Sequence, residues 1–571
     1  MAENNDSTMR RRSLQAKTTA LASSVSVIGV AVGILFFAAS LTPSLMPRTY
    51  LVQGLVSGCC AALGYGAGVL VHWLWLYLEL PQPRTRTRKI AKWSTIAICV
   101  ATAAIFLWKS TEWQNSIRKL MGLDSVQSAE PFELAAIALT VFGFLLLLAR
   151  LFRLTCRFLS SAFERFLPGR VSSVIGAMLA VGLFWSIAEG LLFRSALRLA
   201  DSTFQQLDAI IDDNLAMPAD PAKTGSVPSL IDWKELGRQG RQFISSGTTG
   251  AEIGEFFQQS APDPIRVYVG LNSADTVEER AQLALAELKR DGAFDRSILI
   301  VIVPTGTGWV DPAAVDTVEY LHKGDVASVA LQYSYLSSWL SLLVEPTYGA
   351  EAGRALFREV YHYWTTLPRD HRPKLYLHGL SLGAMNSELS ADLFDIVADP
   401  FQGALWSGPP FQSRTWKSIT ANRIPQSPAW LPRFRDGSIV RFTNQDNALT
   451  IPGAIWGPIR IVYLQYASDP VTFFDFHALY REPDWMKTPR GPDVSPQLRW
   501  FPVVTMVQLL LDMAMATTSP IGYGHVYAPE HYIDAWIAVT DPQGLQADDV
   551  IRLKTSFANK FPHGAEPPAG G

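Results

Sequence analysis

The sequence predicts two regions of different fold: an N-terminal α-helical membrane domain, followed by a three-layer α/β/α domain with a mostly parallel sheet. Three observations lead to this prediction. Long apolar runs are confined to the first two hundred of the 571 residues. Beyond them, short β-branched runs alternate with helical stretches. With 48% hydrophobic and only 18% charged residues, the chain is also too apolar for a protein that is soluble throughout.

Five apolar runs are each close to the roughly 20 residues that a helix needs to cross the hydrocarbon of a bilayer. Basic residues precede the first run, which could be read as a signal peptide, but the four further runs favour a retained signal anchor. The sequence therefore predicts about five membrane spans, with the lipid bilayer as a partner. The runs occupy about 21–41, 51–80, 90–108, 132–149 and 171–193.

The distribution of lysine and arginine predicts the topology. These residues cluster at 84–92 and at 150–170, whereas the turn near residues 47–50 has only Arg48, and the loop at 109–131 is mixed in sign. The positive-inside rule places the N-terminus and both clusters in the cytoplasm. With five crossings of the inner or plasma membrane, everything after about residue 194 is expected to lie outside the cytoplasm.

Composition divides the chain into five segments. We expect a cytoplasmic tail over 1–20, a transmembrane domain over 21–197, an amphipathic helix and linker over 198–263, the α/β domain over 264–560 and a disordered tail over 561–571. The amphipathic helix is expected at 195–215, where it overlaps the end of the last membrane segment.

Composition also excludes several classes of partner. A net charge of −2 gives no basic field of the kind that nucleic-acid binding requires. The large domain after residue 200 has no cysteine, so it cannot use a thiolate as nucleophile or metal ligand. We expect no cofactor and no metal, and the sequence predicts no particular oligomeric state.

The predicted α/β domain contains seven strand-like runs. Unbroken β-branched runs that are separated by helical stretches are typical of a parallel sheet that is buried on both faces. The sequence therefore predicts that the carboxyl ends of these strands share one edge of the sheet. The runs are 265–271, 297–303, 326–335, 374–380, 403–408, 438–442 and 460–470.

The stretch YLHGLSLGA, at 376–384, places Ser381 two residues from a glycine on either side. Such a string is frequent by chance, but here it follows a strand-like run and precedes a run with helical periodicity, which together indicate a nucleophile elbow. Side chains at Gly379 and Gly383 would collide in so tight a turn. Ser381 is then expected above the sheet at a helix N-terminus, where a developing anion is favoured.

A serine hydroxyl is a weak nucleophile until a base takes its proton and an acid orients that base. His525, in the stretch IGYGHVY, is the predicted base, with His531 as the alternative. Asp469 follows a strand-like run in VYLQYASDPV and is the predicted acid. Asp446 is its rival, although it sits in an Asn-rich turn where an aspartate often only caps the backbone.

An oxyanion formed at Ser381 needs backbone N–H donors. The predicted donors are Leu382, directly after the serine, and Thr305 and Gly306 in the loop of IVIVPTGTGW, at 300–309. A phosphate-binding loop is the other reading of this segment. No Lys-Ser or Lys-Thr pair follows it, so that reading is disfavoured.

These features together resemble the α/β-hydrolase superfamily, in which the triad follows the order serine, acid, histidine. The whole chain, with its multispan N-terminal region and the stretches VPTGTGWVDP, HGLSLGA, YASDPV and GYGHVY, resembles the bacterial membrane-anchored α/β-hydrolase family. The resemblance implies Ser381 as nucleophile, Asp469 as acid and His525 as base, and it implies no defined substrate. The Pro-Thr-Gly-Thr-Gly loop departs from the His-Gly oxyanion motif of many lipases.

We therefore expect a membrane-anchored serine hydrolase of esterase or lipase type that cleaves a lipid-linked acyl ester through an acyl-enzyme. An acyltransferase with the same triad, a non-catalytic envelope interaction module and a transporter are the alternatives. The aromatic segment 473–520 is expected as a lid or acyl-binding wall, with Phe473, Phe474 and Trp485 at the mouth, or as a plain sheet-covering helix over 501–516.

Overall fold

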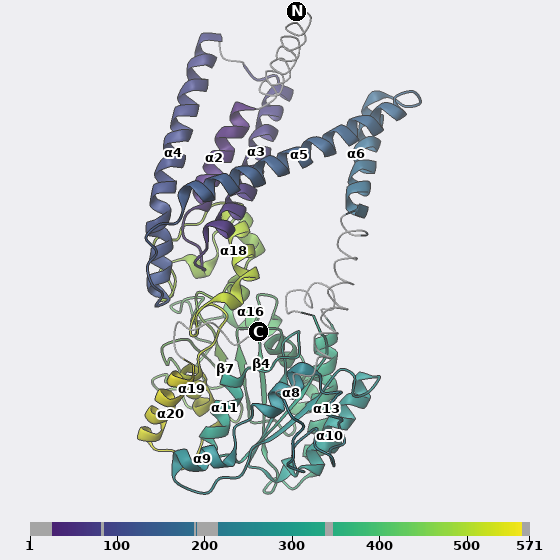
Figure 1. Cartoon of the computed structure of the whole chain (residues 1–571), viewed down its shortest axis with the longest axis vertical. Coiled ribbons are helices and arrows are strands. Elements are labelled where there is room, and N and C mark those ends of the chain that lie inside the picture. Colours follow the sequence, from purple (N-terminus) through teal and green to yellow (C-terminus); the bar gives the residue numbers. More distant parts are fainter. Residues whose placement is uncertain (1–25, 82–84, 188–189, 191–214, 337–346, 562–571) are drawn as a thin grey trace, which may run out of the picture.

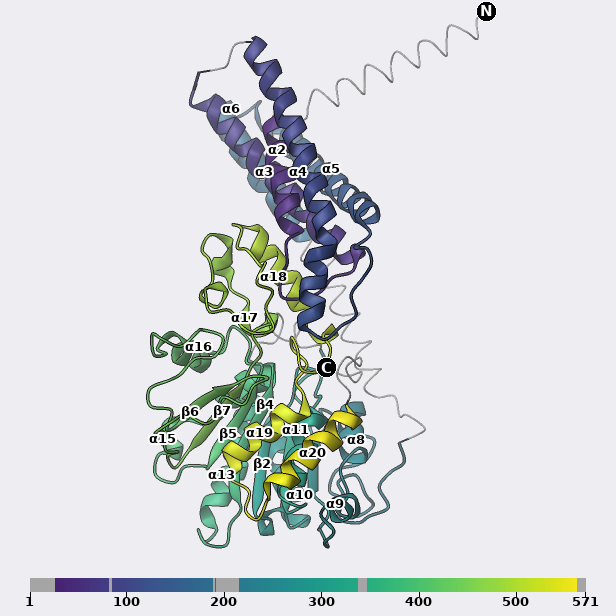
Figure 2. The same cartoon turned by 90° about the vertical axis from the view of Figure 1, so that its left-hand side faces the viewer.

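The computed structural model describes residues 26–81, 85–187, 190, 215–336 and 347–561. A helical region lies at one end of the molecule and an α/β domain at the other (Figures 1 and 2). The tail expected at 1–20 lies outside the described residues, as do all but the last residue of the expected amphipathic helix and all but the first of the C-terminal tail.

The helical region contains four helices that are long and apolar enough to cross a membrane. A fifth, α2, has 14 described residues and belongs to the first of the five expected spans. Helices α2 and α3 pack closely: a Cβ added at Gly64 or Gly68 would lie 2.7 Å from a backbone carbonyl oxygen of α2. The bounds are α2 Val27–Ser40, α3 Tyr50–Tyr77, α4 Thr85–Leu120, α5 Pro131–Phe163 and α6 Gly169–Ser186.

Helix α4 is longer than the apolar run that predicted it. It has 36 residues and continues to Leu120, so the loop that we expected at 109–131 is reduced to 121–130. Figures 1 and 2 show that α4 ends beside the α/β domain, as do α2 and the start of α5. The turns after α3 and α5, which adjoin the two basic clusters, lie at the opposite end of the helical region.

The α/β domain is built on a seven-stranded sheet in the order β1-β3-β2-β4-β5-β7-β6, with every neighbouring pair parallel. Helices cover both faces, so β1, β2 and β3 are buried along their whole length. This confirms the predicted three-layer parallel fold. The strands are β1 Ile265–Val269, β2 Ile298–Val303, β3 Val326–Leu331, β4 Lys374–Leu380, β5 Gly403–Ser407, β6 Val440–Thr443 and β7 Arg460–Leu464.

Two helical layers enclose this sheet (Figure 2). One contains α10 (Val277–Arg290), α13 (Tyr348–Thr366) and α14 (Leu382–Glu388), and the other contains α11 (Pro312–Leu321), α19 (Pro529–Thr540) and α20 (Ala547–Lys560). The remaining described helices of the domain are α8 Gly237–Ser245, α9 Gly250–Phe257, α15 Leu393–Ile396, α16 Arg414–Ala421, α17 Pro470–Phe473 and α18 Val504–Ala514, with short 3-10 turns at Ala293–Asp295, Phe476–Leu479, Asp484–Met486 and Ala516–Thr518.

The segment before residue 264, which we expected to be a linker, packs into the α/β domain from about residue 224. Ile231 and Trp233 are buried in its core. The Thr224 hydroxyl donates a hydrogen bond to the carbonyl oxygen of Arg266 in β1, at 3.1 Å. The prolines of this segment therefore mark turns against the sheet domain and not a free tether.

Helix α18 packs against the helical region. The alternative prediction for 501–516, a helix that covers the sheet, is therefore wrong. Its Val504 is buried in a cluster with Ala39, Val56 and Cys60 of α2 and α3. Figures 1 and 2 show α18 between the two regions. The three aromatic residues that we expected at an open mouth are each at most 5% exposed and belong to the main core: Phe473, Phe474 and Trp485.

Candidate active site

Ser381 occupies the sharp turn between β4 and α14. Its φ of 58° and ψ of −125° lie in a region that residues with a side chain rarely adopt. Its N–H donates to the Ser407 carbonyl oxygen at the end of β5, at 2.9 Å. A Cβ at Gly379 would collide with the backbone of Gly383, and a Cβ at Gly383 would collide with the carbonyl oxygen of Val303. The two glycines are therefore what allows this turn to close.

Asp469 follows β7 and caps the N-terminus of α17. Its side chain is fully buried. One carboxylate oxygen accepts from the backbone N–H groups of Val471 at 2.8 Å and Thr472 at 3.3 Å. The other accepts from the Thr472 hydroxyl at 3.1 Å and the Tyr527 hydroxyl at 2.7 Å. All these neighbours donate, which fixes the carboxylate in one orientation.

His525 lies between this carboxylate and the serine turn. Its Nδ1 is 2.7 Å from Oδ2 of Asp469. An ionised carboxylate only accepts, so Nδ1 carries the proton and Nε2 is left as an acceptor. On the other side, the ring is against Gly408, where an added Cβ would be 2.7 Å from Cε1. Gly408 directly follows Ser407, whose carbonyl oxygen accepts from Ser381, so the imidazole lies beside the serine turn.

The Nε2 atom of His525 is buried and makes no hydrogen bond with any residue that the structure describes. The bond between Ser381 Oγ and this nitrogen is therefore not formed here. Such bonds in free enzymes are often long and tighten only when substrate binds. Nε2 of His525 is thus a free acceptor among the described residues, at the edge of the sheet where Ser381 lies, and the Asp469 carboxylate fixes the orientation of its ring.

The loop after β2 contains two of the three predicted oxyanion donors, and the structure engages one of them elsewhere. The Thr305 N–H donates to the Trp309 carbonyl oxygen at 3.0 Å, so it closes the turn and does not serve as the predicted donor. Gly306 lies in the same turn. Leu382 is the first residue of α14, where backbone N–H groups have no partner within the helix. The contact between Gly383 and Val303 brings this loop against the serine turn.

Asp446 and His531, the alternatives to Asp469 and His525, lie in different environments. Asp446 is exposed, and its backbone carbonyl accepts from the Thr443 hydroxyl at 3.3 Å. His531, in α19, is buried: it is only 9% exposed, and its Nδ1 is 2.6 Å from the Tyr466 hydroxyl. The structure pairs His525, and not His531, with Asp469.

A second buried carboxylate, which the sequence analysis did not single out, holds the two loops in place. Asp493 accepts from the backbone N–H of Ser468 at 3.0 Å and from its hydroxyl at 2.6 Å. Ser468 Oγ in turn accepts from the N–H of Gly524 at 2.9 Å. Ser468 precedes Asp469 and Gly524 precedes His525, so this one hydroxyl links both loops. The only sequence signal was the placement of Ser468 directly before the predicted acid.

Asp311 is a third buried carboxylate near the site. It caps α11, accepts from Ala313 N–H at 2.9 Å and accepts from the Tyr532 hydroxyl at 2.9 Å. Burial raises the pKa of Asp311 to about 7, although these hydrogen bonds oppose the shift. Its signal in the sequence was the Asp-Pro pair that begins a helix, which is typical of a cap.

A seven-stranded parallel sheet with helices on both faces, and a serine in the sharp turn after its central strand, defines an α/β-hydrolase fold. Comparison with known families agrees. The profile described as "Alpha/beta-hydrolase family" matches residues 265–553, and that described as "Alpha/beta-hydrolase family N-terminus" matches residues 41–247. The chain belongs to this alpha/beta-hydrolase family, and membership indicates a hydrolytic enzyme. No curated protein and no solved structure matches the chain.

Asp311 should make stability depend on pH. Its folded pKa is raised, so between about pH 4 and pH 7 the folded protein holds a proton that the unfolded chain has released. The unfolding free energy therefore falls as the pH rises through this window. Asp311→Asn removes the effect, and relative to wild type it should gain on the order of 4 kcal/mol between pH 4 and pH 8, measured by thermal unfolding in detergent.

Asp399 provides a control for the sign of this effect. Its pKa is lowered, chiefly by the hydrogen bond from Arg372, so Asp399→Asn should change the pH dependence in the opposite direction. An Asp311→Asn protein that keeps the wild-type pH dependence would exclude Asp311 as the titrating group.

Proposed function

We propose that this protein is a membrane-anchored serine hydrolase of esterase or lipase type, with Ser381 as nucleophile, His525 as base and Asp469 as acid. The observation that carries the proposal is the 2.7 Å contact between His525 and Asp469, which leaves Nε2 as an unpaired, buried acceptor beside the serine turn. The surrounding donors to Asp469 support the role of an orienting acid. A non-catalytic module would have no need of this arrangement.

The reaction follows from these positions. Ser381 Oγ attacks the acyl carbonyl carbon while its proton passes to His525 Nε2, and negative charge develops on the carbonyl oxygen near the Leu382 N–H. The intermediate collapses, the ester C–O bond breaks, and His525 returns the proton to the leaving alcohol. Water then attacks the acyl-enzyme with His525 again as base, which releases the carboxylic acid and restores the serine. An acceptor alcohol in place of water would give acyl transfer.

The surroundings of α18 support a lipid-linked acyl ester as substrate. Phe476 and Tyr480 are 62% and 66% exposed, in the segment that packs beside α18, and α18 packs on α2 and α3. The Phe476 ring contacts both Phe411 and Phe474, with centroids 5.6 and 4.8 Å apart. Phe411 lies three residues after Gly408, which contacts His525. Aromatic side chains thus extend from the catalytic site towards the apolar helices.

The arrangement of the helical region supports an extracytoplasmic catalytic domain in the cell membrane. The basic clusters adjoin the turns at the end of the helical region that is remote from the α/β domain (Figures 1 and 2). The positive-inside rule assigns that end to the cytoplasm. The α/β domain is then on the opposite side.

A fluorophosphonate probe should label the wild-type protein on Ser381, because a serine activated by His525 attacks the phosphorus as it would an acyl carbon. Ser381→Ala should abolish labelling and leave the thermal unfolding midpoint near the wild-type value. Peptide mapping by mass spectrometry identifies the modified residue. Undiminished labelling of the alanine variant would refute the nucleophile assignment.

Asp469→Asn should lower esterase turnover on the order of 10⁴-fold, because an amide does not hold the imidazole in the productive tautomer. Asp446→Asn is the matched control, and its turnover should stay within a factor of two of wild type, about 0.4 kcal/mol in barrier. Both rates are measured with a short-chain chromogenic ester. Loss of turnover in the Asp446 variant alone would transfer the role of acid to that residue.

Cysteine labelling tests the topology. In a background without the four native cysteines, Val227→Cys, at a position that is 84% exposed in the α/β domain, should react with an impermeant maleimide in intact spheroplasts. Phe166→Cys, at an 83% exposed position in the turn after α5, should react only after permeabilisation. The reverse pattern would place the α/β domain in the cytoplasm.

A further inference from the structure

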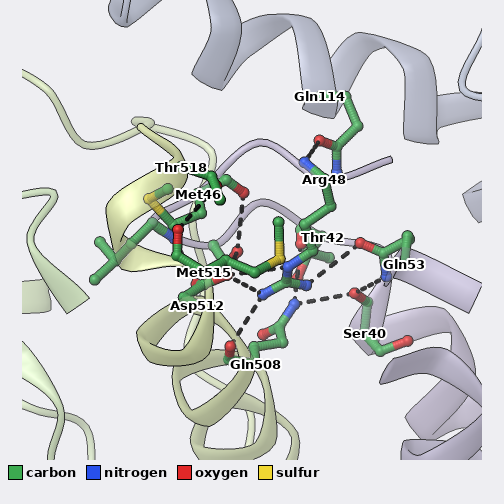
Figure 3. Close-up of polar contacts among 12 residues, drawn as sticks. Ser40, Thr42, Met46, Arg48, Gln53, Gln114, Gln508, Asp512, Met515 and Thr518 are labelled. Atoms are coloured by element: carbon green, nitrogen blue, oxygen red, sulfur yellow. Dashed lines mark hydrogen bonds and ion pairs between the residues drawn. The ribbon is translucent and has the colours of Figure 1, made fainter. Parts of the chain in front are cut away.

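A buried ion pair joins the helical region to the α/β domain (Figure 3). Arg48 lies in the loop between α2 and α3, and Asp512 lies on α18. Oδ1 of Asp512 is 2.7 Å from Nη2 and 3.0 Å from Nε of Arg48. The two side chains are 1% and 0% exposed. A charge pair with two donors and almost no access to water defines the relative position of its partners closely.

The polar groups around this pair complete its hydrogen bonding. Asp512 also accepts from the Ser44 hydroxyl at 3.2 Å and from the Leu45 N–H at 3.1 Å. Arg48 also donates to the Gln508 carbonyl oxygen, at 3.1 Å. Figure 3 shows residues of the 41–49 loop and of α18 converging on the guanidinium and carboxylate groups. Removal of one charge would leave the other buried without a partner, so the loop and α18 are held together as a unit.

The same loop contacts the segment that carries His525. Ser519, which follows α18, donates from its hydroxyl to the Met46 sulfur at 3.3 Å. Gly524 has a φ of +55°, and a Cβ there would lie 3.3 Å from that sulfur and would collide with Ser519. The N–H of His525 donates to the Ala516 carbonyl oxygen at 3.3 Å. The segment from α18 to His525 is thus folded back on itself against Met46.

The acid loop is also supported by the helical region. Ser116 of α4 and Ser495 share a hydrogen bond of 2.8 Å between their hydroxyl groups. Two residues earlier, Asp493 holds Ser468, which directly precedes Asp469. Met46 and Ile117 are buried in the same hydrophobic cluster as the core of the sheet domain. Both candidate catalytic loops therefore rest on residues from before position 120.

We infer that Arg48 and Asp512 are positioning residues for the reaction: through Met46 and α18, the ion pair sets the place of His525 relative to Ser381. This inference rests on the proposed function, because it assigns the pair a role in that triad. The helical region is then a structural part of the active site as well as an anchor. A displacement of about 1 Å in a catalytic group is enough to reduce a rate on the order of 100-fold.

The test measures fluorophosphonate labelling of the full-length protein in detergent and separates two quantities. The final extent of labelling reports the folded fraction, whereas the bimolecular rate constant reports how well His525 activates Ser381 in each folded molecule. Arg48→Met should lower the rate constant at least tenfold. Hydrolysis of a chromogenic ester should show the same loss in kcat, with KM changed less than twofold.

Arg266→Met is the matched control. Arg266 is 5% exposed and pairs with Asp316 at 2.8 Å and Glu319 at 2.7 Å, at the start of an edge strand of the sheet. The Arg266→Met variant loses a comparable buried ion pair, three strands away from β4 in the sheet. Its rate constant should match wild type even where instability lowers its extent of labelling. The pair variant Arg48→Met/Asp512→Leu removes both charges and keeps apolar side chains of similar size, which such sites often tolerate.

The outcomes separate the hypotheses. Slow labelling of folded Arg48→Met, or of the pair variant if the single variant does not fold, supports the inference. A wild-type rate constant in either folded variant overturns it and leaves the proposed function intact. Failure of both variants to fold assigns the pair to folding alone and also overturns it. If the wild-type protein itself is not labelled at Ser381, the proposed function fails first.

Discussion

The structure depends on one close backbone approach, at the point where β4 turns into α14. Gly379 and Gly383 have no room for a Cβ, and Ser381 between them is held in a strained conformation. A strained residue persists only when its surroundings determine it, and here those surroundings are a parallel sheet that is buried on both faces. The packing of this sheet compensates for the strain of the serine turn at its edge.

Around this fixed point, the other candidate catalytic groups are placed by buried polar contacts and not by the strands alone. Asp469 and His525 belong to separate loops, and Ser468 connects them through its hydroxyl. A buried carboxylate supports each loop through hydrogen bonds. Asp493 accepts from Ser468, next to the candidate acid, and Asp512 anchors the segment that leads to the candidate base. Buried networks of this kind specify geometry because each unpaired member would be costly.

The sequence predicted the features that depend on local pattern. Buried β-branched runs gave the strands, and the glycine spacing with its flanking strand and helix gave Ser381, because such a turn is a local property of the backbone. Asp469 and His525 were predicted because each follows a strand-like or glycine-rich segment near the expected edge, and the structure brings their side chains together. These are positions that a fold of this class uses repeatedly.

The features that were missed depend on tertiary contacts. The apolar periodicity of α18 is the same whether the helix covers a sheet or packs on α2 and α3, so its location was open until the structure placed it. In the sequence, Arg48 was only a single charge in a loop. Its partner, Asp512, is 464 residues away, so local pattern could not indicate the pair. Thr305 was expected as a donor because its loop is glycine-rich, but the closure of the turn by Trp309 decides where its N–H points.

Helix α4 is a continuous, rigid connection between the helical region and the α/β domain. The apolar run ends near residue 108, so the remaining 12 or so residues to Leu120 extend the helix by about 18 Å beyond that run. At its end, Ser116 meets Ser495 in the α/β domain. A flexible tether would let the two regions take many relative orientations, whereas a continuous helix joined to the α/β domain by side-chain contacts limits them. The length of α4 thus contributes to the spacing between the helical region and the α/β domain.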